Sequence, residues 1–173
     1  YSGSVYENKN NNPFKYNPEE AVRLLKEAGY TTRNSDGWLV HETSNKVLSF
    51  EIVIQKTSAY MVTPVQQMLK EYGIDMQIKF IDRTTRWKNL MDRNFTVDIQ
   101  AWGGLVYPNP ETMFKSTLAD QKNNNNMYGF KSDRVDELLP LYDIEFDHDK
   151  RVKIIQEIDS IIVESRYSAL GLS

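Results

Sequence analysis

Three stretches of the chain alternate apolar and polar side chains with the period of a β-strand, so that one face of each strand is expected to be buried. In the third stretch Phe95, Val97 and Ile99 point to one face, and Thr96, Asp98 and Gln100 point to the other. The apolar positions of the first two are Leu48, Phe50, Ile52 and Ile54, and then Ile74, Met76, Ile78 and Phe80. The pattern predicts strands at about 48–54, 74–80 and 95–100.

Between these strands the apolar residues recur at the spacing of an α-helix. One predicted helix covers 58–72 and stops at Gly73, and a shorter one covers 84–93. The resulting order is strand, helix, strand, helix, strand. Connections of this length favour right-handed crossovers between parallel strands. The predicted fold class is therefore α/β, with a mixed sheet flanked by helices.

Further helices are predicted towards both ends of the chain, each with a recognisable start. Asn17 can cap a helix that Gly29 closes, while Ser132 and Asp147 can cap two helices near the other end. A short helical piece is expected at 111–114.

The remaining segments are predicted to be irregular. Residues 1–16 are polar and Asn-rich and are expected to rest on structure elsewhere, while 31–46 form a polar connection with a short strand at 38–40. The asparagine run at 123–126 has two interpretations, a ligand loop or a flexible solvated connection. Its composition favours the solvated connection.

The candidate binding residues follow the third predicted strand. Trp102 lies where that strand ends, the position at which open α/β sheets hold their ligands, and Gly103 and Gly104 allow close approach to the backbone. Tyr107, next to Pro108, is a second aromatic candidate. The alternatives are a Trp packed in the core, glycines that serve only the turn, and an ordinary exposed loop tyrosine.

Composition narrows the function classes. The 173 residues (1–173) suit a single domain, and 40% apolar residues are enough for one core. A net charge of −3 gives no support to nucleic-acid binding, and the apolar runs are too short to span a bilayer.

The sequence offers little evidence for catalytic or metal-binding residues. The absence of cysteine removes disulfides, thiolate nucleophiles and Cys-based zinc sites, and His41 and His148 lack carboxylates at metal-ligand spacing. Helical carboxylates such as Asp133 and Asp136 are explained by solvated faces. We therefore expect no enzyme, no catalytic residue, no metal and no cofactor.

Several segments together resemble the family 5 extracellular solute-binding proteins, the dipeptide- and oligopeptide-binding receptors of ABC importers. The matching residues are 16–30 (YNPEEAVRLLKEAGY), 66–76 (QQMLKEYGIDM), 87–90 (WKNL), 101–102 (AW), 133–139 (DRVDELL) and 151–159 (RVKIIQEID). The resemblance implies the second lobe of a type II periplasmic-binding-protein fold, similar to domain 3 of the dipeptide-binding proteins.

The resemblance also implies a function and partners. Members of the family are longer, and this chain begins at Tyr1, so we expect a C-terminal lobe fragment whose first lobe is missing. The family captures a small solute, an oligopeptide or oligosaccharide, between two lobes and delivers it to a membrane ABC permease. The expected location is periplasmic or extracytoplasmic, with a lipoprotein anchor as one form. The alternative is a sensor or protein-interaction module that reuses the same lobe.

One departure from the family pattern bears on the ligand. Peptide-binding members carry an acidic residue shortly after the Trp, where it pairs with the free amino group of the peptide. Leu105 stands at that place here. The candidate ligand-binding residues are therefore Trp102, Gly103, Gly104, Leu105 and Tyr107, with the two aromatic rings able to stack on a sugar ring or on a side chain.

Overall fold

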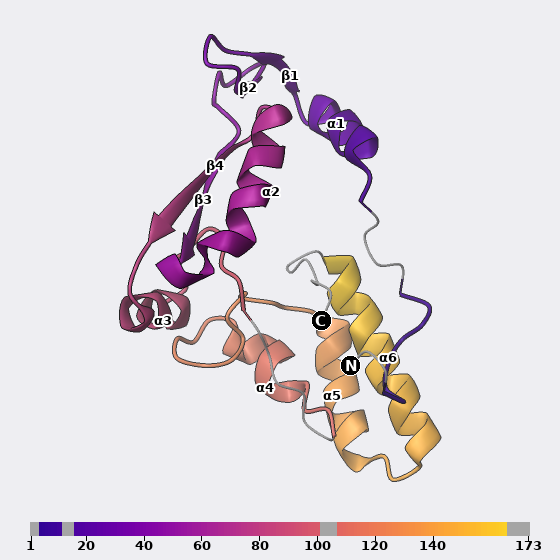
Figure 1. Ribbon diagram of the computed structural model, residues 1–173. Coiled ribbons are helices and arrows are strands. Elements are labelled where there is room, and N and C mark those ends of the chain that lie inside the picture. Colours follow the sequence, from indigo (N-terminus) through magenta and orange to yellow (C-terminus); the bar gives the residue numbers. More distant parts are fainter. Residues whose placement is uncertain (1–3, 12–15, 101–106, 166–173) are drawn as a thin grey trace. The chain divides into compact units, whose positions relative to one another are not determined.

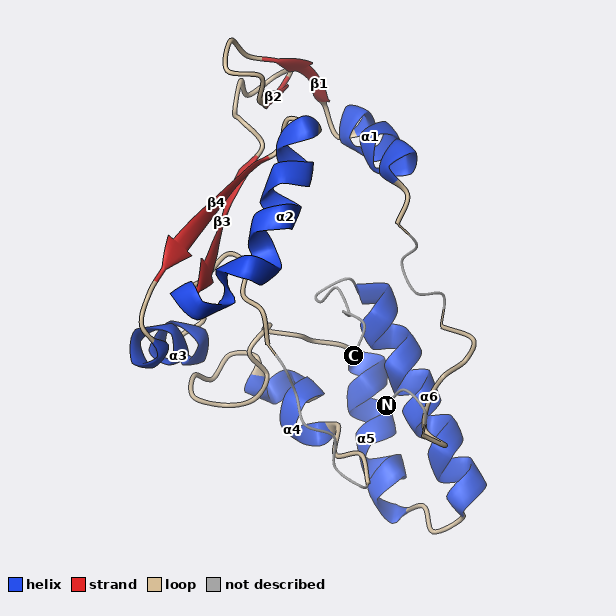
Figure 2. Ribbon diagram, viewed as in Figure 1, coloured by secondary structure: helices blue, strands red, loops and turns tan. Residues whose placement is uncertain are grey.

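The computed structural model describes residues 4–11, 16–100 and 107–165, and it contains both helices and short sheets (Figures 1 and 2). The predicted α/β fold class is confirmed. Contacts between residues divide the chain into two compact units. Unit 1 is Tyr1–Phe14, Met91–Arg93 and Ala101–Ser173, and unit 2 is Lys15–Leu90 and Asn94–Gln100. The single domain over 1–173 stays a prediction.

The centre of unit 2 is a β-α-β crossover. Strands β3 (Ser49–Ile54) and β4 (Asp75–Phe80) pair in parallel, and helix α2 (Ala59–Glu71) connects them. Ile52 and Ile54 pack with Val62 of α2 and Met76 of β4 in a buried cluster. Phe50 and Ile78 pack against this cluster, whereas Phe80 at the end of β4 is half exposed. The predicted parallel crossover is confirmed.

The opposite face of this two-stranded sheet is mostly polar, with Val53 as a buried apolar member. Glu51 pairs with Lys79 at 3.5 Å, and Asp75 accepts hydrogen bonds from Ser49 and Gln77, each at 3.0 Å. These polar groups bond to one another across the strands and along β4.

The prediction of a third strand at 95–100 is wrong, because only one residue of this segment pairs with the sheet. Helix α3 (Arg83–Met91) is followed by a segment in which Val97 alone makes an isolated parallel bridge, to Ile52. The expected faces also fail, because Ile99 is 39% exposed while the side chain of Asp98 is only 4% exposed. An ion pair to Arg86, described below, turns Asp98 inward.

Residues 31–46 contain more structure than a polar connection. Strands β1 (Tyr30–Arg33) and β2 (Leu39–His41) form an antiparallel hairpin, and Leu39 donates a backbone hydrogen bond of 2.7 Å to Gly73 at the end of α2. The short strand near 38–40 was expected, whereas β1 was not. Its side chains beyond Tyr30 are exposed, so it has no alternating apolar pattern to reveal it.

Two glycines of unit 2 offer a matched test of this packing. Gly73 and Gly37 have φ of +81° and +88°, where a side chain is strained. A Cβ on Gly73 would also lie 3.0 Å from both the Arg33 Cζ and the Gly37 carbonyl oxygen, while one on Gly37 would meet nothing within 4 Å. We expect Gly37→Ala to lower the free energy of unfolding by about 1 kcal/mol and Gly73→Ala by about 2–3 kcal/mol. Equal losses in urea titrations would show that the close contact at Gly73 costs nothing.

Three helices begin directly after the capping residues from which their starts were predicted. Asn17 accepts a hydrogen bond from the Glu20 amide at 3.0 Å at the start of α1 (Pro18–Glu27). In unit 1, Ser132 caps α5 (Asp133–Ile144) and Asp147 caps α6 (His148–Ser165). The short helix α4 (Glu111–Phe114) is also where it was expected.

The core of unit 1 lies between α5 and α6, which run side by side (Figure 1). Its buried members are Tyr6, Phe130, Val135, Leu138, Leu139, Tyr142, Ile155 and Ile158. Tyr6 belongs to residues 4–11, which we call the N-terminal strap. Asn8 in the strap donates hydrogen bonds to the Gln156 carbonyl oxygen at 2.8 Å and to Ser160 at 2.7 Å. The strap has no helix or strand and is held on α6 by side chains.

The asparagine run at 123–126 is not a solvated connection throughout, and that interpretation is wrong for Asn126. Its side chain is fully buried, donates to the Phe130 carbonyl oxygen at 2.9 Å and accepts from the Phe130 amide at 2.8 Å. The guanidinium of Arg93 donates to the backbone carbonyl oxygens of Leu118, Gln121 and Asn126. A positive charge and a buried amide therefore organise this loop.

Candidate ligand-binding segment

Four of the five candidate residues, Trp102, Gly103, Gly104 and Leu105, lie outside the described residues. Tyr107 is described and belongs to unit 1. Its side chain is 65% exposed, in the loop that leads to α4. An exposed phenol with an apolar ring is able to stack on a ligand and to donate a hydrogen bond.

The chain just after Tyr107 is anchored to the core of unit 1. Pro108 is buried, and its carbonyl oxygen accepts a hydrogen bond of 2.8 Å from the hydroxyl of Tyr142. Burial raises the pKa of Tyr142, and the Arg151 guanidinium, 4.3 Å from the centre of that ring, opposes the shift. The hydroxyl therefore stays protonated as a donor at neutral pH. Nothing in the apolar pattern of α5 distinguishes this Tyr from an ordinary core residue.

The chain just before the candidate segment is anchored within unit 2. Arg86 of α3 donates from Nε to one carboxylate oxygen of Asp98 at 3.0 Å and from Nη2 to the other. The same Nη2 donates to the Ile99 carbonyl oxygen, and Gln100 donates to the Asp98 carboxylate at 2.5 Å. We call this group the Arg86–Asp98 clasp. Asp98 occupies a polar position of the predicted strand, so nothing in the sequence distinguishes it from a solvated carboxylate.

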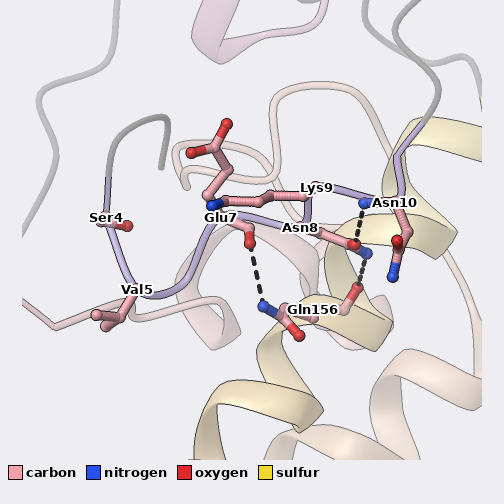
Figure 3. A pocket seen from close by; sticks show the side chains of 7 residues that line it. All are labelled: Ser4, Val5, Glu7, Asn8, Lys9, Asn10 and Gln156. Atoms are coloured by element: carbon pink, nitrogen blue, oxygen red, sulfur yellow. Dashed lines mark hydrogen bonds between the residues drawn. The ribbon is translucent and has the colours of Figure 1, made fainter.

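A hollow of about 520 Å³ lies in unit 1 between the N-terminal strap and α6 (Figure 3). Several of its polar groups bond to one another: Gln156 donates to the Glu7 carbonyl oxygen at 3.0 Å, and Asn8 bonds to the Gln156 carbonyl oxygen and to the Asn10 amide. These hydrogen bonds hold the N-terminal strap on α6. They account for the polar residues around the hollow, so no ligand is needed to explain them.

Two of the titratable residues named in the sequence analysis, His41 and Asp136, bond to the backbone of nearby turns. His41 accepts backbone hydrogen bonds at Nδ1 from Thr43 and Ser44, at 3.2 and 3.3 Å. Asp136 accepts from the Ser116 amide at 2.9 Å, at the short helix η2 (Ser116–Leu118). Within the described ranges, no three His, Cys, Asp or Glu side chains gather in a way that would hold a metal ion, and no helix is long and apolar enough to cross a bilayer.

Comparison with solved structures defines the class of fold. The chain superposes on the oligopeptide-binding protein AppA of Bacillus subtilis, solved with a nonapeptide, with a TM-score of 0.79 and 22% identity. That match covers 95% of this chain and 33% of the other. A periplasmic oligopeptide-binding protein of Thermotoga maritima with bound mannohexaose gives a TM-score of 0.78 at 19% identity, over 94% of this chain and 32% of the other. The fold is that of the type II periplasmic binding proteins.

The family follows from the sequence itself. Residues 1–125 match the bacterial extracellular solute-binding proteins, family 5 Middle, and the chain belongs to this family. The probable peptide-binding protein YejA of Agrobacterium fabrum is 28% identical over 154 residues, which are 87% of this chain and 25% of that protein. The chain spans about a quarter of the length of the curated relatives it matches.

Proposed function

We propose that this chain is the second lobe of the solute-binding component of an ABC import system. The match of residues 1–125 to the family is the observation that carries the proposal. The relatives named for peptide binding, and solved structures of the same fold with a nonapeptide and with mannohexaose, support an oligopeptide or an oligosaccharide as ligand. The protein captures the solute and does not transform it.

The proposed partners are the first lobe of the same protein and a membrane ABC permease. A type II binding protein closes two lobes around its ligand by a hinge, so one lobe supplies one wall of the site. The proposed location is periplasmic or extracytoplasmic, in keeping with a family of extracellular proteins, and a lipoprotein anchor is one form of attachment.

The proposed contact residues of this lobe are Trp102, Gly103, Gly104, Leu105 and Tyr107. Leu105 carries no charge, so it offers nothing to pair with a peptide amino group. A peptide ligand would therefore be held through its backbone and side chains, and a sugar ligand through stacking on Trp102 and Tyr107.

Calorimetric titration of the full-length gene product tests this proposal. The probes are a synthetic nonapeptide, the same nonapeptide with an acetylated amino terminus, and mannohexaose. We expect saturable binding of peptide or sugar, and we expect acetylation to change a peptide Kd by less than about threefold, because a lost charge pair would cost more. A ligand at 100 times its Kd should also raise the free energy of unfolding by about 2.7 kcal/mol.

Two results would contradict the proposal in different ways. If none of the probes binds or stabilises the protein, the proposal that it is a receptor for peptides or sugars is wrong. If the free nonapeptide binds and acetylation weakens it by about a hundredfold or more, the role of Leu105 is wrong and an acid elsewhere holds the amino group.

A further inference from the structure

Helix α1 buries none of its residues, although its sequence is that of a helix with one packed face. Its apolar side chains Ala21, Leu24, Leu25 and Ala28 recur at the spacing that places them on one side. We call these residues the α1 stripe. Leu24 is 44% exposed, Leu25 is partly buried, and both alanines are exposed. The described part of the chain therefore leaves this apolar face uncovered.

A helix of this size gains little stability from its own contacts. α1 has 10 residues, whereas isolated helices shorter than about 12–15 residues are marginal in water. Its local supports are polar: Asn17 caps the first turn, and Arg23 pairs with Glu20 at 2.6 Å and with Glu27. Exposed ion pairs of this kind contribute little. Since packing of the apolar face supplies most helical stability in proteins, we expect the α1 stripe to have a partner surface.

The carboxyl end of α1 is fixed on the β1–β2 hairpin of unit 2. Gly29 lies so close to the imidazole of His41 that a Cβ on this glycine would be 2.9 Å from Nε2. The Gly29 carbonyl oxygen also accepts a hydrogen bond of 2.8 Å from the Glu42 amide. The rings of Tyr30 and His41 meet edge to face, with their centroids 5.3 Å apart. The α1 stripe is thus held in one direction with respect to this hairpin.

The charges of α1 do not suit a membrane surface. The helix carries Glu19, Glu20 and Glu27 against Arg23 and Lys26. Amphipathic helices that bind anionic lipid are rich in lysine and arginine on their polar face, because these attract the headgroups. The α1 stripe is therefore a better match for a protein surface.

The size of the α1 stripe favours a surface on the same polypeptide. A stable interface with a second copy takes about 20–30 residues a side, and two leucines with two alanines fall well short of that. A tethered surface needs less contact area, because the tether gives it a high effective concentration. Such a surface has room to exist, since this chain covers 25% of the Agrobacterium fabrum relative and 33% of the solved AppA chain.

We infer that the α1 stripe is a docking face for the part of the full-length protein outside residues 1–173, which the proposed function identifies as the first lobe. The inference rests on the proposed function for the existence of that lobe. It goes beyond it by assigning the contact to one face of α1, and this face has no part in contacting the solute.

Single cysteines in the full-length gene product test whether the α1 stripe is covered. Ala21→Cys and Leu24→Cys place a thiol on the stripe, and Lys26→Cys places one on the exposed polar side of the same helix. Ala21→Cys changes the side-chain volume little, so it does not depend on the loss of a leucine. We expect the thiols at 21 and 24 to react with Ellman's reagent at least about tenfold more slowly than the thiol at 26, because a covered thiol reacts only after local opening. The unsubstituted protein gives the background rate.

Photo-crosslinking identifies what covers the α1 stripe. Benzoylphenylalanine is placed at position 24 or, as the control, at position 26 of the full-length gene product. Products that keep the size of a monomer on a denaturing gel are assigned by mass spectrometry. We expect crosslinks from position 24 to residues outside 1–173, and a yield at background level from position 26.

The outcomes separate this inference from the proposed function. Rates at 21, 24 and 26 within about threefold of one another would overturn the docking face, whether or not the protein binds a solute. Crosslinks confined to residues 1–173, or products of dimer size, would also overturn it. If the stripe thiols are protected and crosslinks from position 24 reach residues outside 1–173, the docking face stands even where neither the nonapeptide nor mannohexaose binds.

Discussion

Replacing Asn126 by Ala is expected to lower the free energy of unfolding by about 3 kcal/mol. The side chain is fully buried and donates to the carbonyl oxygens of Phe130 and Lys115, at 2.9 and 3.3 Å, while it accepts from the Phe130 amide at 2.8 Å. Alanine would leave these backbone groups without partners, and each unsatisfied buried group costs about 1–3 kcal/mol. Urea titration followed by circular dichroism measures the loss.

The same loop supplies the control. Asn125 is exposed, so Asn125→Ala should change the free energy of unfolding by no more than about 0.5 kcal/mol. Asn126→Asp is a sharper variant, because a carboxylate has the same shape but cannot donate to the Phe130 carbonyl oxygen. Burial raises the folded-state pKa of such an Asp above its unfolded value, so the loss is largest at neutral pH and shrinks as pH falls towards about 4. Equal stability of the Asn125 and Asn126 variants would contradict the structural role of the buried amide.

The second large effect is expected at Trp102. If it is a wall of the ligand site, Trp102→Ala should weaken binding of the nonapeptide or mannohexaose by about 30- to 100-fold, which corresponds to about 2–3 kcal/mol. Large aromatic side chains at a binding site lose this much on truncation because both stacking area and exclusion of water disappear. Calorimetric titration of the full-length gene product measures the change.

Trp38, in the hairpin of unit 2, is the control for Trp102. Trp38→Ala removes the same side chain next to β2 and should leave the Kd within about twofold of wild type. Trp102→Phe should recover most of the affinity, because an aromatic face remains. A Trp102→Ala protein that loses stability but keeps its affinity would show that this Trp packs in the core.

The sequence reveals those parts of the fold that depend on local rules. Asn17, Ser132 and Asp147 cap their helices because short polar side chains reach the free amides of the first turn, and no distant contact is needed for that. Parallel pairing of β3 and β4 also follows from pattern and connection length.

The sequence predictions failed where a side chain bonds to a residue elsewhere in the chain. The predicted strand at 95–100 shrinks to a bridge at Val97 because Asp98 is drawn to Arg86, twelve positions earlier in the chain. Asn126 is buried because the backbone of Phe130 and Lys115 surrounds it, and its neighbours in the asparagine run give no hint of which member is inside.

The candidate site divides in the same way. The contact residues proposed from the aromatic and glycine pattern stay a prediction, and the one that the structure describes, Tyr107, is exposed. The bonds made by the residues on either side of the candidate segment do not show in the sequence, because the hydroxyl of Tyr142 reaches Pro108, and the guanidinium of Arg86 reaches Asp98, from helices elsewhere in the chain.

The N-terminal strap has a consequence for the order in which the chain is made. Asn8 and Asn11 bond to Gln156, Asp159 and Ser160 of α6, so a ribosome must release nearly the whole described chain before the strap finds its place. Unit 2 ends at Gln100, before α5 and α6 are synthesised. Translation therefore delivers the residues of unit 2 first, while Tyr6, a buried member of the core of unit 1, meets its partners on α6 only after that helix has been made.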